Sequence, residues 1–155
     1  MGNEKIRFLV FLSLILVNFT PQAQATLGGL ANSIEADRQS LSAIRHDDVV
    51  RTNYTVEEIQ SGSVKVREYV SSTGVIFGVA WNGLTHPDLQ TLLGLHYYGL
   101  YQNTLSQMKL VRGRKNLVVK NENLVVRKGG HQRSLLGQAY DPSLVPKGVT
   151  TDEIK

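Results

Sequence analysis

The segment Val75–Trp81 constrains the fold of this chain more than any other. All of its residues are apolar, and the turn residues Ser72-Thr73-Gly74 precede it. A short apolar run bounded by turn residues predicts a strand that is buried on both faces. Strict alternation would put Val75, Phe77, Val79 and Trp81 on one face, leaving the small Gly78 and Ala80 on the other. The chain therefore needs a sheet with this strand at its centre.

Two hairpins are predicted on either side of this strand. Residues 54–60 and 63–70 have β-type patterns and flank Ser61-Gly62, where glycine tolerates the positive φ of a tight turn. In that register Glu58 would face Lys65 and Tyr54 would face Tyr69. The near-repeats 116–120 and 123–127 predict a second hairpin around Asn121-Glu122. Residues 134–140 predict one more strand.

Two helices are expected between the strand groups. Pro87 and Asp88 suit a first helical turn, and Leu89, Leu92 and Leu93 share a face before Gly94 ends the helix. A second helical stripe has Tyr97, Tyr101, Leu105 and Met108 on one side. The order of strands, then helices, then strands predicts an α+β fold: a single domain, mainly an antiparallel sheet of about five to six strands, with one or two helices inserted between strand groups.

The N-terminus has the three regions of a signal peptide. Lys5 and Arg7 precede an apolar stretch that stops at Asn18, well short of the ~20 residues that span a bilayer. Ala23 and Ala25 are small residues at the positions that signal peptidase requires. We predict cleavage after Ala25 and export to the periplasm or the medium.

The remaining boundaries follow from composition. Residues 26–51 are polar, with a weak helical stripe at Ile34, Leu41 and Ile44, and are interpreted as a linker or a loosely packed helix. Residues 52–150 form the expected α+β domain, and residues 151–155 a tail. The chain has no cysteine, so this core is expected to be stable without disulfides.

Glu68 is the first candidate for chemistry. Alternation puts this carboxylate on the same strand face as Val64, Val66 and Val70, so it must be paired, protonated or functional. Structurally, an arginine could pair with it, or the face could be half-exposed near the sheet edge. Functionally, it could be an acid with a raised pKa, with His131 or Asp88 as its catalytic partner.

Metal and cofactor signals are weak. The four histidines, His46, His86, His96 and His131, lack the short helical spacing of zinc ligands. His131 follows Gly129-Gly130, and neither this glycine pair nor Gly28-Gly29 has the further residues of a phosphate loop. His86 and Asp88 are interpreted first as a helix start. No metal and no cofactor are predicted.

Positive charge gathers in the last third of the chain. Eight basic residues occur in a 25-residue span that contains one acidic residue, Glu122: Lys109, Arg112, Arg114, Lys115, Lys120, Arg127, Lys128 and Arg133. On a hairpin they could form a basic surface that attracts an anionic polymer. The alternative is ordinary edge-strand protection. The candidate binding residues are Lys115, Lys120, Arg127, Lys128, Arg133 and Trp81. Nucleic acid is not expected, since interleaved aromatic residues are missing.

Several of these segments carry a family resemblance. The chain resembles exported bacterial proteins of domain-of-unknown-function family 2844 over residues 52–150. The matching residues are 66–70, 74–83, Pro87-Asp88-Leu89, Leu92-Leu93-Gly94, Gly129-Gly130-His131, Gly137-Gln138-Ala139-Tyr140, Pro142, Pro146 and Gly148-Val149. Leu84 and Gln132 stand where the family often has proline and methionine. The resemblance implies export and a compact domain, and it implies no activity.

Three functions stay open on these grounds. The first is a non-catalytic envelope or secreted protein that binds an anionic envelope polymer or another envelope protein. The second is a small hydrolase or lyase acting on cell wall or polysaccharide through a Glu/His pair. The third is self-assembly through the apolar strands. The first is favoured because the chain has no recognisable catalytic set, and the oligomeric state stays open.

Overall fold

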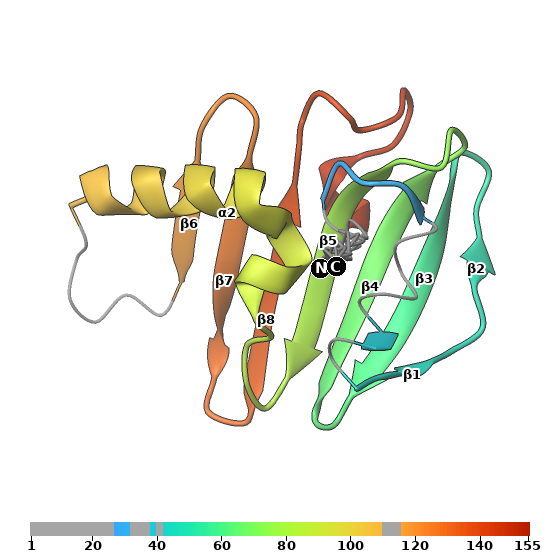
Figure 1. Cartoon of the computed structure of the whole chain (residues 1–155), viewed down its shortest axis with the longest axis horizontal. Helices are drawn as coiled ribbons and strands as arrows, with labels where there is room; N and C mark the ends of the chain where they lie inside the picture. The colour runs from blue at the N-terminus through green and yellow to red at the C-terminus, as the bar shows by residue number, and fades with distance from the viewer. Residues whose placement is uncertain (1–26, 32–37, 40–41, 110–115) are drawn as a thin grey trace, which may run out of the picture.

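The computed structural model describes residues 27–31, 38–39, 42–109 and 116–155. Within these residues the chain forms one antiparallel sheet in the order β1-β3-β4-β5-β8-β7-β6, with β2 pairing alongside β1 on β3. Figure 1 shows the sheet with α2 lying across one of its faces. The strands are β1 (Ile44–Arg45), β2 (Val49–Val50), β3 (Tyr54–Ser61), β4 (Val64–Ser71), β5 (Ile76–Gly83), β6 (Leu117–Lys120), β7 (Val125–His131) and β8 (Ser134–Tyr140).

The predicted α+β class with an antiparallel sheet is confirmed, but the strand count was too low. The sheet has eight strands in the described residues instead of five or six. The two additional strands, β1 and β2, are only two residues long, and both of their residues are exposed. Strands this short lack the alternating pattern by which a strand is recognised in a sequence.

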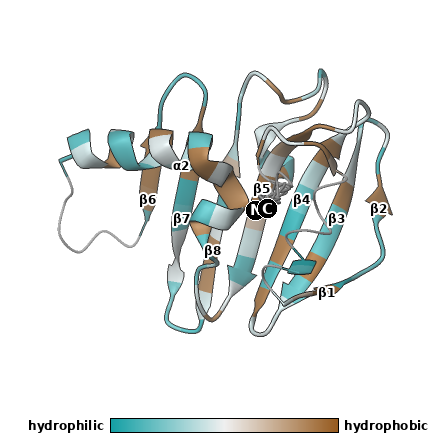
Figure 2. Cartoon of the chain, viewed as in Figure 1, coloured by the Kyte–Doolittle hydropathy of each residue, from teal (hydrophilic) through white to brown (hydrophobic). Residues whose placement is uncertain are grey.

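The β3–β4 hairpin forms with a register two residues from the predicted one. Glu58 lies opposite Arg67, and Tyr54 lies opposite Ser71. The predicted partners meet diagonally instead: Lys65 Nζ lies 2.9 Å from Glu58 Oε1, and the Tyr54 and Tyr69 rings are 5.9 Å apart. A shift of two residues keeps every side chain on the same face of the sheet. The predicted faces of β3 and β4 are therefore correct although the predicted register is not. Figure 2 shows the resulting change between hydrophobic and hydrophilic residues along β3 and β4.

Strand β5 is buried from Ile76 to Trp81, as predicted for a central strand, but its alternation is broken. The β4–β5 register shifts because Tyr69 pairs with Gly78 whereas Val70 pairs with Ile76. Phe77 is the extra residue, so Phe77 packs on one side of the sheet whereas Val79 and Trp81 pack on the other. The single odd-numbered face expected from the sequence is wrong because a bulge turns every residue before it to the opposite face.

The expected pair of helices is one bent element, α2 (Leu89–Gln107). It bends at Gly94, whose φ of 69° and ψ of 167° are non-helical and suit glycine. The helix begins at Asp88, whose carboxylate accepts hydrogen bonds from the Gln90 N–H and the Thr91 hydroxyl. The predicted leucines and Tyr101 are buried against the sheet. We call this covered side the helix face.

The opposite side of the sheet is the open face. The chain after β8 returns across it through η2 (Thr151–Glu153), and its end lies over the middle of the sheet (Figure 1). Ile154 is fully buried here and packs on Gly78, where a Cβ would stand 3.0 Å from its side chain. This segment covers a second apolar cluster that consists of Tyr54, Tyr69, Phe77, Ala80, Val125, Tyr140 and Ile154.

The described parts of residues 26–51 lie against the sheet. Leu27 and Ala43 are 2% and 3% exposed, and the Leu27 N–H donates to the Leu92 carbonyl. Of the expected helical stripe, Ile34 and Leu41 lie outside the described residues, and Ile44 belongs to β1. The predicted signal peptide, residues 1–25, also lies outside them.

Candidate functional site

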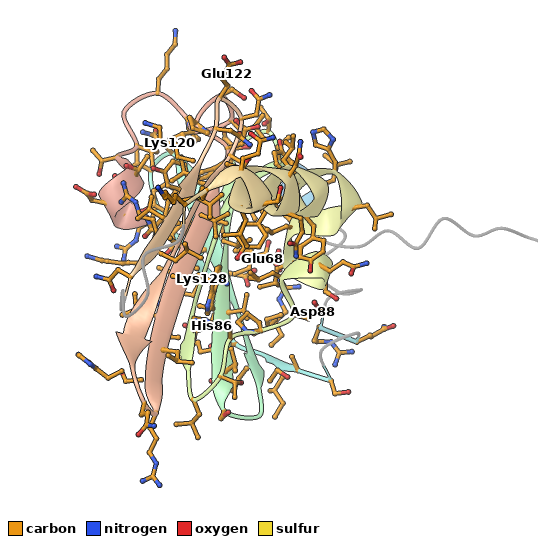
Figure 3. All side chains as sticks on the ribbon, turned by 90° about the vertical axis from the view of Figure 1, so that its left-hand side faces the viewer. Glu68, His86, Asp88, Lys120, Glu122 and Lys128 are labelled. Atoms are coloured by element: carbon orange, nitrogen blue, oxygen red, sulfur yellow. The ribbon has the colours of Figure 1, made fainter. Side chains whose placement is uncertain are left out.

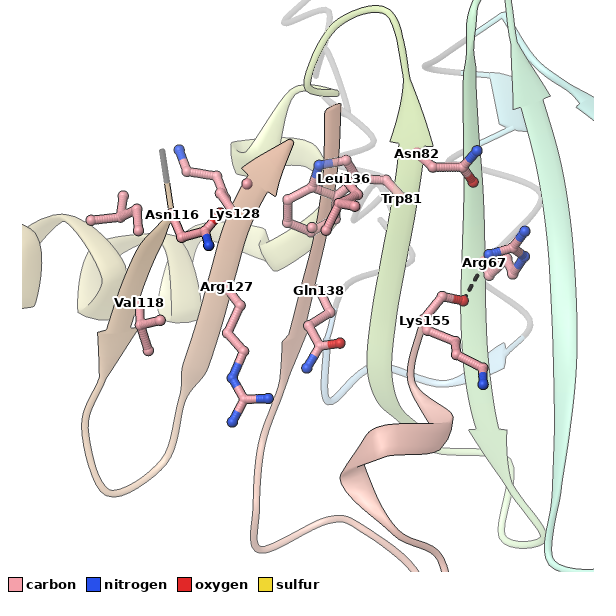
Figure 4. A pocket seen from close by; sticks show the side chains of 13 residues that line it. Arg67, Trp81, Asn82, Asn116, Val118, Arg127, Lys128, Leu136, Gln138 and Lys155 are labelled. Atoms are coloured by element: carbon pink, nitrogen blue, oxygen red, sulfur yellow. Dashed lines mark hydrogen bonds between the residues drawn. The ribbon is translucent and has the colours of Figure 1, made fainter. Parts of the chain in front are cut away.

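A groove of about 460 Å³ lies on the open face, beside the C-terminal segment. Its polar lining residues come from β4, β5, β7 and β8, from Asn116 beside β6 and from the chain end, and Figure 4 shows the residues that line it. We define this open-face groove by Arg67, Asn82, Val118, Arg127, Leu136, Gln138 and Lys155. No Asp or Glu side chain is among the described residues that line it.

The strand register brings these residues together. Arg127 on β7 pairs with Gln138 on β8, and Gln138 pairs with Ala80 on β5, which in turn pairs with Arg67 on β4. Residues paired across neighbouring strands point to the same face, so one row crosses the sheet with an arginine at each end. Three strand spacings of ~4.8 Å put the two arginine Cα atoms roughly 14 Å apart. Ala80, in the middle of this row, is fully buried in the cluster that contains Ile154.

The two arginines of the groove have different surroundings. Arg67 Nε donates to Glu58 at 3.0 Å, and its Nη1 donates to the Lys155 carbonyl at 2.7 Å. Arg127 is exposed and makes no hydrogen bond or ion pair with any described residue. The amides of Asn82 and Gln138 likewise have no partner among the described residues. Arg127 and Gln138 are neighbours in the row, so together they present free donors to one point of the groove.

Two apolar side chains flank Arg127 on the same face. Val118 lies directly opposite it on β6 and is 47% exposed. Leu136 on β8 pairs with Gly129, two residues along β7 from Arg127, and is 55% exposed. The open-face groove thus combines exposed apolar surface with the free guanidinium of Arg127.

At the Arg67 end of the groove, one carboxylate is shared by two cations. Glu58 contacts both Lys65 and Arg67, at 2.9 and 3.0 Å. Burial opposes ionisation of Glu58, but the hydrogen bonds from these two cations outweigh it and hold the pKa of Glu58 below its usual value. Arg67 therefore has an anionic partner, which it shares with Lys65, whereas Arg127 has none among the described residues.

Two of the three catalytic candidates, Glu68 and His131, lie apart. Glu68 is 1% exposed and sits on the helix face of β4, as the alternation predicted, which excludes the half-exposed alternative. It shares a row with Val79, Ala139 and Val126, and His131 lies five residues beyond Val126. Five residues at ~3.3 Å each separate the two groups by roughly 16 Å along the strands alone. His131 is exposed at the β7–β8 turn, so no proton can pass between it and Glu68.

Asp88 and His86 have structural contacts. Asp88 caps α2, as described above, and Figure 3 shows both residues near the start of this helix. The Trp81 indole N–H donates to His86 Nδ1 at 2.9 Å. Burial, with a smaller contribution from Lys128, lowers the pKa of His86 below 6.5. The two side chains do not form a catalytic pair, because Asp88 faces the helix backbone and His86 faces Trp81.

The structure distributes the predicted basic residues over several surfaces. Lys120 and Arg127 point to the open face. Lys128 points to the helix face, where its Nζ lies 5.3 Å from the centre of the Tyr101 ring. Arg133 is exposed at the β7–β8 turn. Lys115 lies outside the described residues, as do Arg112 and Arg114.

Trp81, the remaining binding candidate, is 2% exposed and packs from the helix side into the space that Gly137 leaves. A Cβ at Gly137 would stand 2.2 Å from the Trp81 ring. The indole therefore reaches the groove only as its floor. It is not an exposed stacking platform.

A buried polar cluster joins α2 to the C-terminal segment. Asp141 is 4% exposed and accepts hydrogen bonds from the Tyr97 hydroxyl at 2.6 Å and from the Ser143 N–H and hydroxyl. Burial and the bond to Asp141 raise the pKa of Tyr97 far above its usual value. Every oxygen of this carboxylate has a partner, which is the pattern of a structural anchor.

Sequence reasoning missed Arg67, Asn82 and Gln138 as groove residues. Each is one polar residue in an alternating strand, which is the ordinary pattern of a solvated face. The signal that could have found them is the apolar Leu136, whose same-face neighbours on the strand, Ser134 and Gln138, are polar.

Two further observations limit the chemistry of the described residues. No group of three His, Asp or Glu side chains among them could hold a metal ion. None of the helices described is both long and apolar enough to cross a bilayer.

Fold and site together define a small α+β protein with a helix on one face of an antiparallel sheet and a ligand-sized groove on the other. The chain belongs to a family of proteins of unknown function, DUF2844, whose sequence profile matches residues 23–154. The match is wider than the resemblance seen over residues 52–150. Neither a curated protein nor a solved structure matches the chain.

Proposed function

We propose that this chain is an exported, non-catalytic binding protein that holds an anionic ligand in the open-face groove. The observation that carries the proposal is the free guanidinium of Arg127, which faces a groove whose described lining contains no carboxylate side chain. An arginine without a partner beside a free amide is a ready site for a carboxylate or phosphate group, since guanidinium binds such groups through two parallel hydrogen bonds.

The dimensions of the groove support this function. A volume of about 460 Å³ falls in the usual range of ~300–1,000 Å³ for small-molecule sites. Such sites are mostly apolar with a few convergent polar groups, and Leu136 and Val118 beside Arg127 and Gln138 fit that description. The binding function is favoured over the catalytic alternative because Glu68 and His131, the Glu/His pair of that alternative, do not meet, and Asp88 caps α2.

Export rests on the N-terminal pattern described above. A chain cut after Ala25 would begin at Thr26 and would retain Leu27, which is buried against α2. Cell fractionation followed by N-terminal sequencing tests this part. We expect the protein outside the cytoplasm with Thr26 first, and an intact N-terminus in the cytoplasmic fraction would contradict export.

Binding is tested by retention on immobilised heparin, used as a general polyanion, over a salt gradient. Arg127→Gln should elute at clearly lower salt than the natural protein, because the free guanidinium that faces the groove is removed. Arg133→Gln is the matched control, since it removes the same charge from the exposed β7–β8 turn, outside the groove. No retention, or the same salt shift for both variants, would count against a site at Arg127.

A further inference from the structure

We propose that the ligand of the open-face groove is an amphipathic anion: one carboxylate or phosphate head group on an alkyl chain. This inference rests on the proposed function, and it names the class of ligand. The head group binds Arg127 and Gln138, and the alkyl chain lies over Leu136 and Val118.

The head group is placed by the free donors of the groove. Arg67 is already occupied by Glu58 and by the Lys155 carbonyl. Arg127 has no described partner, and Gln138 is its direct neighbour across the β7–β8 ladder. The guanidinium and the amide N–H can therefore donate to the two oxygens of one anionic group.

The alkyl chain is placed by the exposed apolar residues. Val118 and Leu136 are both about half exposed, and they lie on either side of Arg127 in the strand order of the open face. Among the described residues that line the groove, they are the two large apolar side chains that are exposed; Val49, which is 46% exposed on the same face, does not line it. Covering Val118 and Leu136 removes apolar surface from water, which favours a ligand with its own apolar part.

A long anionic polysaccharide fits these surroundings less well. Sugar rings are typically held by exposed aromatic faces, and the one tryptophan, Trp81, is 2% exposed. The free positive charge in the described lining lies at Arg127 and Lys155 and does not form a continuous track, because Lys128 lies over the Tyr101 ring on the helix face. The C-terminal segment also crosses the open face beside the groove and interrupts it at Lys155 (Figure 4).

The experiment compares the binding of hexanoate and decanoate to the purified protein by titration calorimetry. Both have the same head group, so their difference reports only the alkyl chain. Four extra methylenes that are half covered should tighten binding about tenfold. Arg127→Gln should weaken decanoate binding roughly tenfold, since a charge-assisted bond to the head group is lost.

Two leucine variants test where the alkyl chain of the ligand lies. Leu136→Thr should weaken decanoate binding several-fold and leave hexanoate binding less affected. Leu84→Thr is the matched control, because Leu84 is 53% exposed, close to the 55% of Leu136, and does not line the groove. Leu84→Thr and Arg133→Gln should both bind decanoate like the natural protein.

The outcomes separate this inference from the proposed function. If anion binding depends on Arg127 but decanoate binds no more tightly than hexanoate, the proposal of an amphipathic ligand is wrong and the proposal of an anionic site is supported. Heparin binding that needs Arg127 but not Leu136 leads to the same conclusion and favours a polymer. If Arg127→Gln leaves the binding of decanoate, hexanoate and heparin unchanged, both proposals are wrong.

Discussion

The helix face and the open face of the sheet are built from the same strands but completed differently. On the helix face, α2 covers the strands and buries Leu92, Leu93 and Val66 fully. On the open face, the C-terminal segment covers the cluster around Ile154 and leaves the part over β6, β7 and β8 bare. A strand side chain that points to the covered side is part of the core, whereas its neighbour on the bare side is free to meet a ligand. The candidate site is thus the region that no element of the described chain covers.

The largest expected effect is a difference in stability between leucine variants of the two faces. Leu92→Ala removes a fully buried side chain and should lower the free energy of unfolding by about 2–5 kcal/mol. Leu136→Ala, on the open face, should change it by less than about 0.5 kcal/mol. Urea unfolding measures both. Similar losses for the two variants would mean that Leu136 is part of the core and that the two faces are equally closed.

A smaller loss of stability is expected at Gly137, where the Trp81 ring of the helix face packs against β8. Gly137→Ala puts a Cβ against the Trp81 ring, and overpacking of this kind costs about 1–3 kcal/mol. Gly99→Ala is the control, because no atom lies within 4 Å of its Cβ position and alanine favours a helix. Thermal unfolding should show destabilisation in the first variant and none in the second. A stable Gly137→Ala protein would show that the indole can move away from the floor of the groove.

The hydrogen bond from Tyr97 to Asp141, which joins α2 to the C-terminal segment, should contribute less to the free energy of unfolding. Tyr97→Phe removes the donor to the buried Asp141 and should cost about 1–2 kcal/mol, because one carboxylate oxygen loses its partner. Tyr98→Phe removes an exposed hydroxyl that accepts from Gln102, and should cost less than about 0.5 kcal/mol. Equal unfolding curves for the two variants would show that Asp141 does not anchor the segment to the helix.

The smallest effect is a pH dependence confined to the helix face. The pKa of His86 is lowered by burial and by Lys128, so the unfolded chain takes up a proton at this residue before the folded one does. The contribution of His86 to stability is therefore complete above pH 6.5 and is lost as the pH falls below it. Trp81 is the one tryptophan and donates to His86, so its fluorescence should titrate with a midpoint below 6.5.

His86→Asn serves as the control for this titration, because the asparagine oxygen can still accept a hydrogen bond but does not titrate. Its fluorescence should stay constant between pH 5 and pH 7.5, a range chosen around the usual histidine pKa of ~6.5. A midpoint above 6.5 in the natural protein would contradict the burial of the imidazole.

The sequence predicted the positions of most elements because periodicity and turn residues are local. Strand β8 has the predicted bounds, and the bend in α2 is at the predicted Gly94. The β4–β5 bulge at Phe77 was not predictable, because a run that is apolar at every position contains no alternation that could reveal a change of face.

The candidate site was predicted only in part. Arg127 was chosen because basic residues gather around it in the sequence, and Lys128 was chosen for the same reason. The structure puts these neighbours on opposite faces, since successive strand residues alternate. Glu68 was correctly placed on an apolar face, but its distance from His131 depends on strand order across the sheet, which no local pattern specifies.

By itself the sequence determined the α+β class, the central position of β5, the helix start at Asp88 and the face on which Glu68 lies. These properties depend on residues that are near one another in the chain. The tertiary structure alone decided that Arg67, Arg127 and Gln138 share a groove, and that the C-terminal segment covers one half of the open face and leaves the other half free. Strand order joins residues that are far apart in sequence, and the cooperative packing of the whole sheet selects that order.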